Sequence, residues 1–97
     1  MEYNFEWDPV KAKINERKHG IRFEEAACVF KDSRALTLFD KEHGENEERW
    51  VTMGLIGTIC ICVVHHTFRE EKKGDVLIRI FSARKATKKE QLGYWRE

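Results

Sequence analysis

The sequence has few of the residues that interrupt secondary structure or form disulfide cross-links. It contains one proline, six glycines and three cysteines in 97 residues, a composition unlike that of disordered chains or small disulfide-stapled scaffolds. Cys28, Cys60 and Cys62 are an odd number of cysteines in apolar surroundings, which favours reduced core thiols. A zinc site is not expected, because no second cysteine pair or suitably spaced histidine accompanies Cys60 and Cys62.

Long apolar runs are also missing. No segment approaches the roughly 18 apolar residues of a membrane span, and the acidic start MEYNFEWD lacks the basic and then apolar order of a signal peptide. We therefore expect no membrane association and a cytoplasmic location. With 41% hydrophobic residues in so short a chain, one core and a single domain over residues 1–97 are expected.

The signatures of several common enzyme classes are absent. The sequence contains no P-loop, GxGxxG, GxSxG or HExxH pattern and no paired-carboxylate signature, and no cofactor is expected. Metal-free phosphodiester chemistry stays possible. In it, cationic side chains stabilise the charge that develops on phosphorus, and one side chain moves the proton of a ribose 2′-hydroxyl. Scattered cations on one concave face suffice, so spacing alone cannot establish such a site.

Three helices are predicted, two near the N-terminus and one at the C-terminus, at residues 9–19, 23–30 and 87–97. The first follows Asp8 and Pro9, an N-cap and a proline at the first helical position, and ends at Gly20. Its apolar residues Val10 and Ile14 are expected to face the core. A separate polar stripe should carry Lys11, Asn15 and Lys18.

Alternating apolar residues predict the strands, which are expected at residues 3–7, 35–39, 49–56, 58–68 and 76–83. A capping box of Thr87 and Glu90 then begins the last helix. The order of the elements predicts an α+β fold, a compact antiparallel sheet of about four strands. The helices should cover one face and leave the other partly open.

Basic residues concentrate near the C-terminus. Residues 79–97 carry a formal charge of +4, whereas the whole chain carries +1, which suggests a basic face for an anionic ligand. Period two places Arg79 and Arg84 on opposite faces of the last strand, unless a bulge near Ser82 changes the alternation.

Each arginine has two interpretations. Arg84 and Lys85 lie between a strand and a helix N-terminus, where an oxyanion is favoured, but Arg84 can instead form a surface ion pair with Glu42, Glu47 or Glu48. Arg79 lies inside an apolar run and needs a partner, which is either a ligand or an internal carboxylate of Asp40 or Glu48.

Each histidine can also have a purely structural role. Adjacent residues of a strand point to opposite faces, so one ring of His65 and His66 is expected in the core. His19, beside Lys18, is either a titrating group or a cation at a helix C-terminus. His43 lies in an acidic loop and is either a mobile general acid or a plain loop residue.

Three segments carry a resemblance to a known family. They are FEWDPVKAKINERKHGIRFEEAACVF at residues 5–30, the acidic loop with His43 followed by Glu48 and Arg49, and RIFSARKATKKE at residues 79–90. With them the chain resembles the BrnT toxins of bacterial type II toxin–antitoxin systems. The resemblance implies a RelE-like fold and a metal-independent endoribonuclease that inhibits translation. It also implies RNA as the substrate and a cognate BrnA-like antitoxin, through which the complex binds promoter DNA of its own operon.

The resemblance also suggests residues for the site. The candidate catalytic residues are Arg84, Arg49, His19 and Lys18, and the candidate substrate-binding residues are Arg79, Lys85, Ser82, His43 and Tyr94. Arg84 and Arg49 would hold the scissile phosphate, and His19 or His43 would carry the proton. Phe81 departs from the family pattern, where an aliphatic residue is usual. The alternative is a module that binds RNA or the antitoxin without cleaving RNA.

Overall fold

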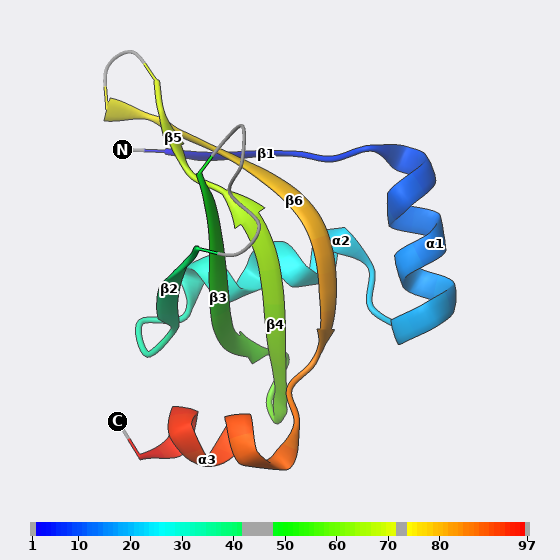
Figure 1. Cartoon of the computed structure of the whole chain (residues 1–97), viewed down its shortest axis with the longest axis vertical. Helices are drawn as coiled ribbons and strands as arrows, with labels where there is room; N and C mark the ends of the chain where they lie inside the picture. The colour runs from blue at the N-terminus through cyan, green and yellow to red at the C-terminus, as the bar shows by residue number, and fades with distance from the viewer. Residues whose placement is uncertain (1, 42–47, 72–73, 97) are drawn as a thin grey trace.

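The computed structural model describes residues 2–41, 48–71 and 74–96, and in these residues six strands form one mixed sheet (Figure 1). The strands are β1 (Tyr3–Glu6), β2 (Leu36–Asp40), β3 (Arg49–Ile56), β4 (Cys60–Thr67), β5 (Arg69–Glu70) and β6 (Val76–Lys85). Their order is β1-β6-β4-β3-β2, and β5 pairs with β6. All paired strands run antiparallel except β1 and β6, which run parallel.

The α+β class is confirmed, but the expected antiparallel sheet of about four strands is wrong in two respects. β1 lies parallel to the distant β6, a pairing that needs a long connection and that a period-two pattern does not reveal. β5 has only two residues, paired with Val76 and Leu77, and is too short to show any alternation.

The helices follow the predicted capping signals closely. α1 (Pro9–His19) begins where Asp8 Oδ1 accepts a hydrogen bond from the Val10 N–H, and it ends at Gly20 in the left-handed conformation. α3 (Lys88–Trp95) begins at the Thr87 capping box. The predicted helix at 23–30 is divided instead, because α2 (Phe23–Ala26) tightens into the 3₁₀ helix η1 (Ala27–Lys31).

The main core lies between one sheet face and the segment formed by α2 and η1. Phe23, Ala26 and Val29 pack there against β4 and β6. Gly54 of β3 is needed for this approach, because a Cβ at that position would lie 2.9 Å from the Val29 Cβ. α3 does not lie on this face, contrary to the prediction, because Tyr94 packs against Ile61 and Val63 of the other face. We call this other, largely uncovered side the open face.

The predicted burial of α1 is wrong. Val10 and Ile14 are 65% and 57% exposed, whereas Asn15 of the supposed polar stripe is 7% exposed. The Asn15 amide accepts from the Ala83 N–H at 3.1 Å and donates to the Ala83 carbonyl at 2.9 Å and the Ile21 carbonyl at 3.2 Å. Since the pairing of β1 with β6 stops at Arg79, the amide takes the place of a neighbouring strand at this edge.

A bulge in β6 decides which side chains reach the open face. His66 of β4 pairs with Ile80, but His65 pairs with Ser82, so the register shifts by one residue. Ile80 and Ala83 therefore both lie in the main core despite their odd spacing. The sequence left a bulge near Ser82 as a possibility, and the structure confirms it. The bulge turns Arg79 and Arg84 to the same face.

Replacing Asn15 by Ala is expected to lower the free energy of unfolding by about 2–4 kcal/mol, because it leaves three buried backbone groups without partners. Ile14→Ala, in the exposed position beside it, should change stability by no more than about 0.5 kcal/mol. Urea unfolding of both variants measures the difference. A larger loss for Ile14→Ala than for Asn15→Ala would contradict the packing described for α1.

Candidate active site

The open face gathers side chains from three strands that are distant in the sequence. Strand alternation places Arg49 at the start of β3 and His65 near the end of β4 on this face. On β6, Phe81, Ser82 and Arg84 lie around the bulge, with Ser82 opposite His65. Cations, an imidazole and a hydroxyl therefore share one surface of the sheet.

Arg49 is held over an aromatic ring. Its guanidinium carbon lies 4.3 Å from the centroid of the Phe81 ring, across β4. Such a cation–π contact is worth about 0.5–2 kcal/mol and fixes the position of the guanidinium. Phe81, a departure from the family pattern in the sequence, is thus the platform for one of the two arginines expected to hold phosphate.

His65 and His66 have opposite environments. His66 is fully buried, and its Nδ1 donates to the Thr67 carbonyl at 2.8 Å while its Nε2 accepts from the Thr52 hydroxyl at 2.7 Å. Burial lowers the pKa of His66, and one ring of the pair lies in the core, as expected. His65 faces the open side.

His65 is the residue that the sequence reasoning missed. Its Nδ1 lies 4.0 Å from Asp40 Oδ2 of β2, and about a third of its side chain is exposed. A carboxylate near one ring nitrogen favours one orientation of the imidazole, and an imidazole on this face can take part in proton transfer. The alternation of β4 could have identified His65. Cys62 and Val64 lie in the main core, so the even-numbered residues of β4 face the core and His65 faces the opposite side.

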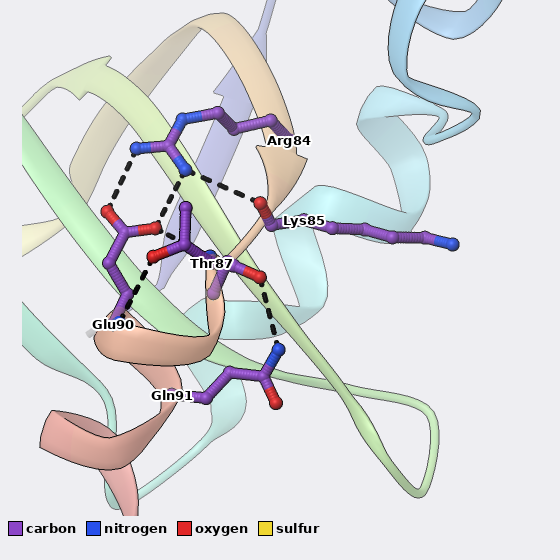
Figure 2. A network of polar contacts seen from close by, with 6 residues as sticks. Arg84, Lys85, Thr87, Glu90 and Gln91 are labelled. Carbon is purple, nitrogen blue, oxygen red and sulfur yellow. Dashed lines mark hydrogen bonds and ion pairs between the residues drawn. The ribbon is translucent and has the colours of Figure 1, made fainter.

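Arg84 forms a bidentate ion pair with Glu90 at the start of α3 (Figure 2). The two guanidinium nitrogens donate to Glu90 Oε1 and Oε2 at 2.8 and 3.0 Å. The sequence reasoning named Glu42, Glu47 or Glu48 as the ion-pair partner; two of these lie outside the described residues, and the observed partner is Glu90. The capping box explains the pair, because Glu90 reaches back to the Thr87 N–H and so faces the end of β6.

The pair between Arg84 and Glu90 affects the charge of both groups. The hydrogen bond from Arg84 lowers the pKa of Glu90 to about 2, and the bond to Glu90 raises the pKa of Arg84. Both side chains are about a third exposed, so solvent weakens the pair. A phosphate that approaches Arg84 therefore meets a charged guanidinium and competes with Glu90 for it.

Arg79 extends the cationic surface of the open face, whereas Lys85 does not. Lys85 pairs with Cys62 of the main core, so alternation along β6 turns its side chain away from the open face. Lys85 is exposed at the end of β6, and Figure 2 shows its side chain pointing away from the ion pair of Arg84 and Glu90. Arg79 lies near the opposite end of β6, 3.5 Å from Glu6 of β1. The expected internal partners, Asp40 and Glu48, are replaced by Glu6 because β1 pairs with β6 and places Glu6 beside Arg79.

The described residues include neither a cluster of typical metal ligands nor a helix that could span a membrane. They contain no group of three His, Cys, Asp or Glu side chains that could hold a metal. Cys28, Cys60 and Cys62 are free; burial raises the pKa of Cys62 to about 12, and Cys28 is exposed rather than in the core. None of the helices in this part of the chain is long and apolar enough to span a bilayer.

A family model described as "Ribonuclease toxin, BrnT, of type II toxin-antitoxin system" matches residues 7–90. The chain belongs to the BrnT family. A search of curated proteins found no match. The solved structure of the Brucella abortus ribonuclease toxin BrnT is similar, with 19% sequence identity and a TM-score of 0.63 over 91% of this chain and all of that chain. At that identity, the likeness shows a shared fold.

Lys18 and His19, the KHG positions of the BrnT pattern, lie away from this surface. They form the last turn of α1, which packs beside the edge of β6 rather than on the open face (Figure 1). Lys18 is exposed and His19 is half-buried. The structure thus does not bring them together with Arg49 and His65. His43, the other proton carrier suggested by the BrnT resemblance, lies outside the described residues.

Tyr94, which matches the last aromatic residue of the BrnT pattern, packs in the interior. It is buried against Ile61 and Val63, and its hydroxyl donates to Asp32 Oδ2 at 2.5 Å. The same carboxylate oxygen accepts from the Leu55 N–H at 2.8 Å. Tyr94 therefore fixes α3, and with it Glu90, against the sheet rather than presenting a surface to RNA.

Glu90→Gln separates the ion pair from the helix cap, because Gln at this position also completes a capping box. The pKa of Glu90 lies near 2 in the folded chain and near 4.5 without partners, so the pair stabilises the fold above pH 4.5 and loses its effect as the pH falls towards 2. The wild type should exceed Glu90→Gln by at most about 1 kcal/mol at pH 7. Denaturant unfolding between pH 7 and 2 should show this advantage disappear; a constant difference would contradict it.

Proposed function

We propose that the chain is a metal-independent endoribonuclease toxin whose active site is the open face of the sheet. The observation that carries the proposal is that Arg49, His65 and Arg84 lie on one face of the sheet, to which the bulge of β6 turns Arg84. The family is one of ribonuclease toxins, and the placement of the two arginines supports a site that works without a metal. Guanidinium groups can hold a phosphodiester and stabilise the charge that develops on it.

In the proposed reaction, His65 takes the proton of a ribose 2′-hydroxyl, and the Asp40 carboxylate, 4.0 Å from its Nδ1, favours the orientation of the ring. The 2′ oxygen then attacks phosphorus, the bond to the 5′ oxygen breaks, and that oxygen takes a proton from solvent water. The products are a 2′,3′-cyclic phosphate and a 5′-hydroxyl. His65 is proposed in place of His19 because it faces the same side as Arg49.

Arg84 would bind the phosphate after Glu90 gives up part of its contact. An arginine that already holds a carboxylate in bidentate geometry presents the fork that a phosphate needs. Lys85, exposed at the end of the same strand but turned to its other side, would add only long-range attraction for the RNA backbone. Ser82, opposite His65, is placed to contact the substrate.

We also propose, from the family, that a cognate BrnA-like antitoxin neutralises the chain by covering the open face. Leu38 of β2 is 72% exposed there, on the side that carries Val51, and offers an apolar contact to a protein partner. The complex would bind promoter DNA through the antitoxin, and the free toxin would inhibit translation in the bacterial cytoplasm by cleaving RNA. A neighbouring reading frame for a small DNA-binding protein would support this pairing.

RNA cleavage in the presence of EDTA tests the nuclease proposal. We expect the wild type to produce 2′,3′-cyclic phosphate ends, Arg49→Ala and Arg84→Ala to lose activity by about 10²–10³-fold, and His65→Ala by about 10²–10⁴-fold. Lys31→Ala removes an exposed cation from η1, on the far side of the sheet, and should leave the rate unchanged.

The competing hypothesis is a module that binds RNA or the antitoxin without cleaving RNA. RNA that stays intact with the wild type while salt-dependent binding persists would support the module and reject the nuclease. Cleavage that EDTA abolishes, or that survives in all three variants of the open face, would reject the proposed site.

A further inference from the structure

Beside the proposed active site, the open face has a hollow of about 260 Å³ at the end of the sheet where β1 and β5 lie. Its walls come from β1, β6 and the short segment between β4 and β5. Its lining includes Glu6 and Arg79, Phe68 and Arg69, and Glu48, the residue directly before β3. None of these residues is needed for the reaction proposed above.

The charge of the hollow indicates an uncharged ligand. Two guanidiniums, of Arg69 and Arg79, and two carboxylates, of Glu6 and Glu48, line it, so the charges of the described lining residues balance. A phosphate would be repelled by the carboxylates as much as it is attracted by the arginines. A neutral group rich in donors and acceptors suits such a lining better.

The ion pair of Glu6 and Arg79 offers a ligand hydrogen-bond acceptors and donors side by side. The shortest contact between the two side chains is 3.5 Å, and both are partly exposed, so the pair is weak and can open for a ligand. Its carboxylate can only accept hydrogen bonds, and its guanidinium can only donate them. Guanine satisfies both groups, with N1–H and the N2 amino group for Glu6 and with O6 and N7 for Arg79.

Phe68 supplies a surface for stacking. Its ring is partly exposed and is held edge-on by Tyr3, with the centroids 6.2 Å apart. An aromatic ring at the wall of a binding hollow contributes about 1–3 kcal/mol to the binding of a stacked base. The hollow thus combines a stacking face with a polar edge, as single-stranded RNA recognition requires.

We propose that this hollow binds a nucleobase of the RNA substrate, with a preference for guanine, next to the bond that is cleaved. Arg79 precedes Phe81 by two residues on the same face, or about 7 Å along the strand. A base in the hollow therefore lies close to a phosphate at Arg49. The inference rests on the proposed function for its place in the reaction, but the binding itself can be measured without cleavage.

The test is a titration of the full chain with each of the four nucleoside 5′-monophosphates, in which binding is measured by NMR or calorimetry. We expect guanosine monophosphate to bind at least tenfold more tightly than the other three and to shift the resonances of Arg79 and Phe68. Glu6→Gln should reduce the preference for guanine about tenfold or more, because an amide replaces one acceptor oxygen by a donor. Glu16→Gln, an exposed carboxylate of α1, is the matched control and should change nothing.

Equal affinities for all four nucleotides, or a guanine preference that persists in Glu6→Gln, would overturn the inference. Phe68→Leu provides a second variant and should weaken every nucleotide alike, since stacking does not distinguish bases. Failure of the nuclease proposal is recognised separately, as intact RNA in the cleavage assay. If RNA is cleaved, mapping of the cut sites should show guanine at one fixed position beside the cut, and random cut sites would contradict the place assigned to the hollow.

Discussion

The one-residue shift between β4 and β6 is the constraint on which the open face depends. With uninterrupted alternation, Arg79 and Arg84 would point to opposite sides, and one guanidinium would lie in the apolar core. The shift at His65 instead buries Ile80 and Ala83 together and sends both arginines outward. A guanidinium without a partner in that core would be strongly destabilising. The bulge thus serves the stability of the core and the composition of the open face at once.

The end of β6 is secured from both sides after the bulge. On the edge, the Asn15 amide binds both backbone groups of Ala83. On the open face, Glu90 holds the Arg84 guanidinium, and Tyr94 anchors α3 through Asp32. Arg84 therefore enters any reaction already oriented. The same ion pair also means that the proposed phosphate site is partly occupied by the Glu90 carboxylate, which a substrate would have to displace.

Local signals predicted the elements of this fold well. The N-cap of α1, its end at Gly20 and the capping box of α3 are decided by neighbouring residues, and all three are confirmed. Signals that depend on distant partners were less informative. The exposed apolar side of α1 was mistaken for its packed side, because the open edge of β6 needs a hydrogen-bonding amide and not an apolar side chain. The parallel pairing of β1 is a property of the whole topology.

The candidate site was predictable to a similar extent. Sequence reasoning selected Arg49 and Arg84, and it stated that a bulge near Ser82 would bring the arginines to one face. It did not select His65, because two adjacent histidines look alike until the core side of β4 is known. Glu90 was recognised as a helix cap, but its second contact depends on the angle at which α3 meets β6. Lys18 and His19 were associated with the site by family pattern, whereas the fold packs α1, which carries them, beside the edge of β6.

The most direct measurement is an NMR titration of the chain with a 2′-deoxy dinucleotide, which carries the phosphate but lacks the attacking hydroxyl. If the open face holds the scissile phosphate, the resonances of Arg49, His65 and Arg84 shift together along one saturating curve, while those of Lys18 and His19 stay in place. Shifts confined to α1, or an Arg84 resonance that does not respond at saturation, would contradict the assignment of the active site to the open face.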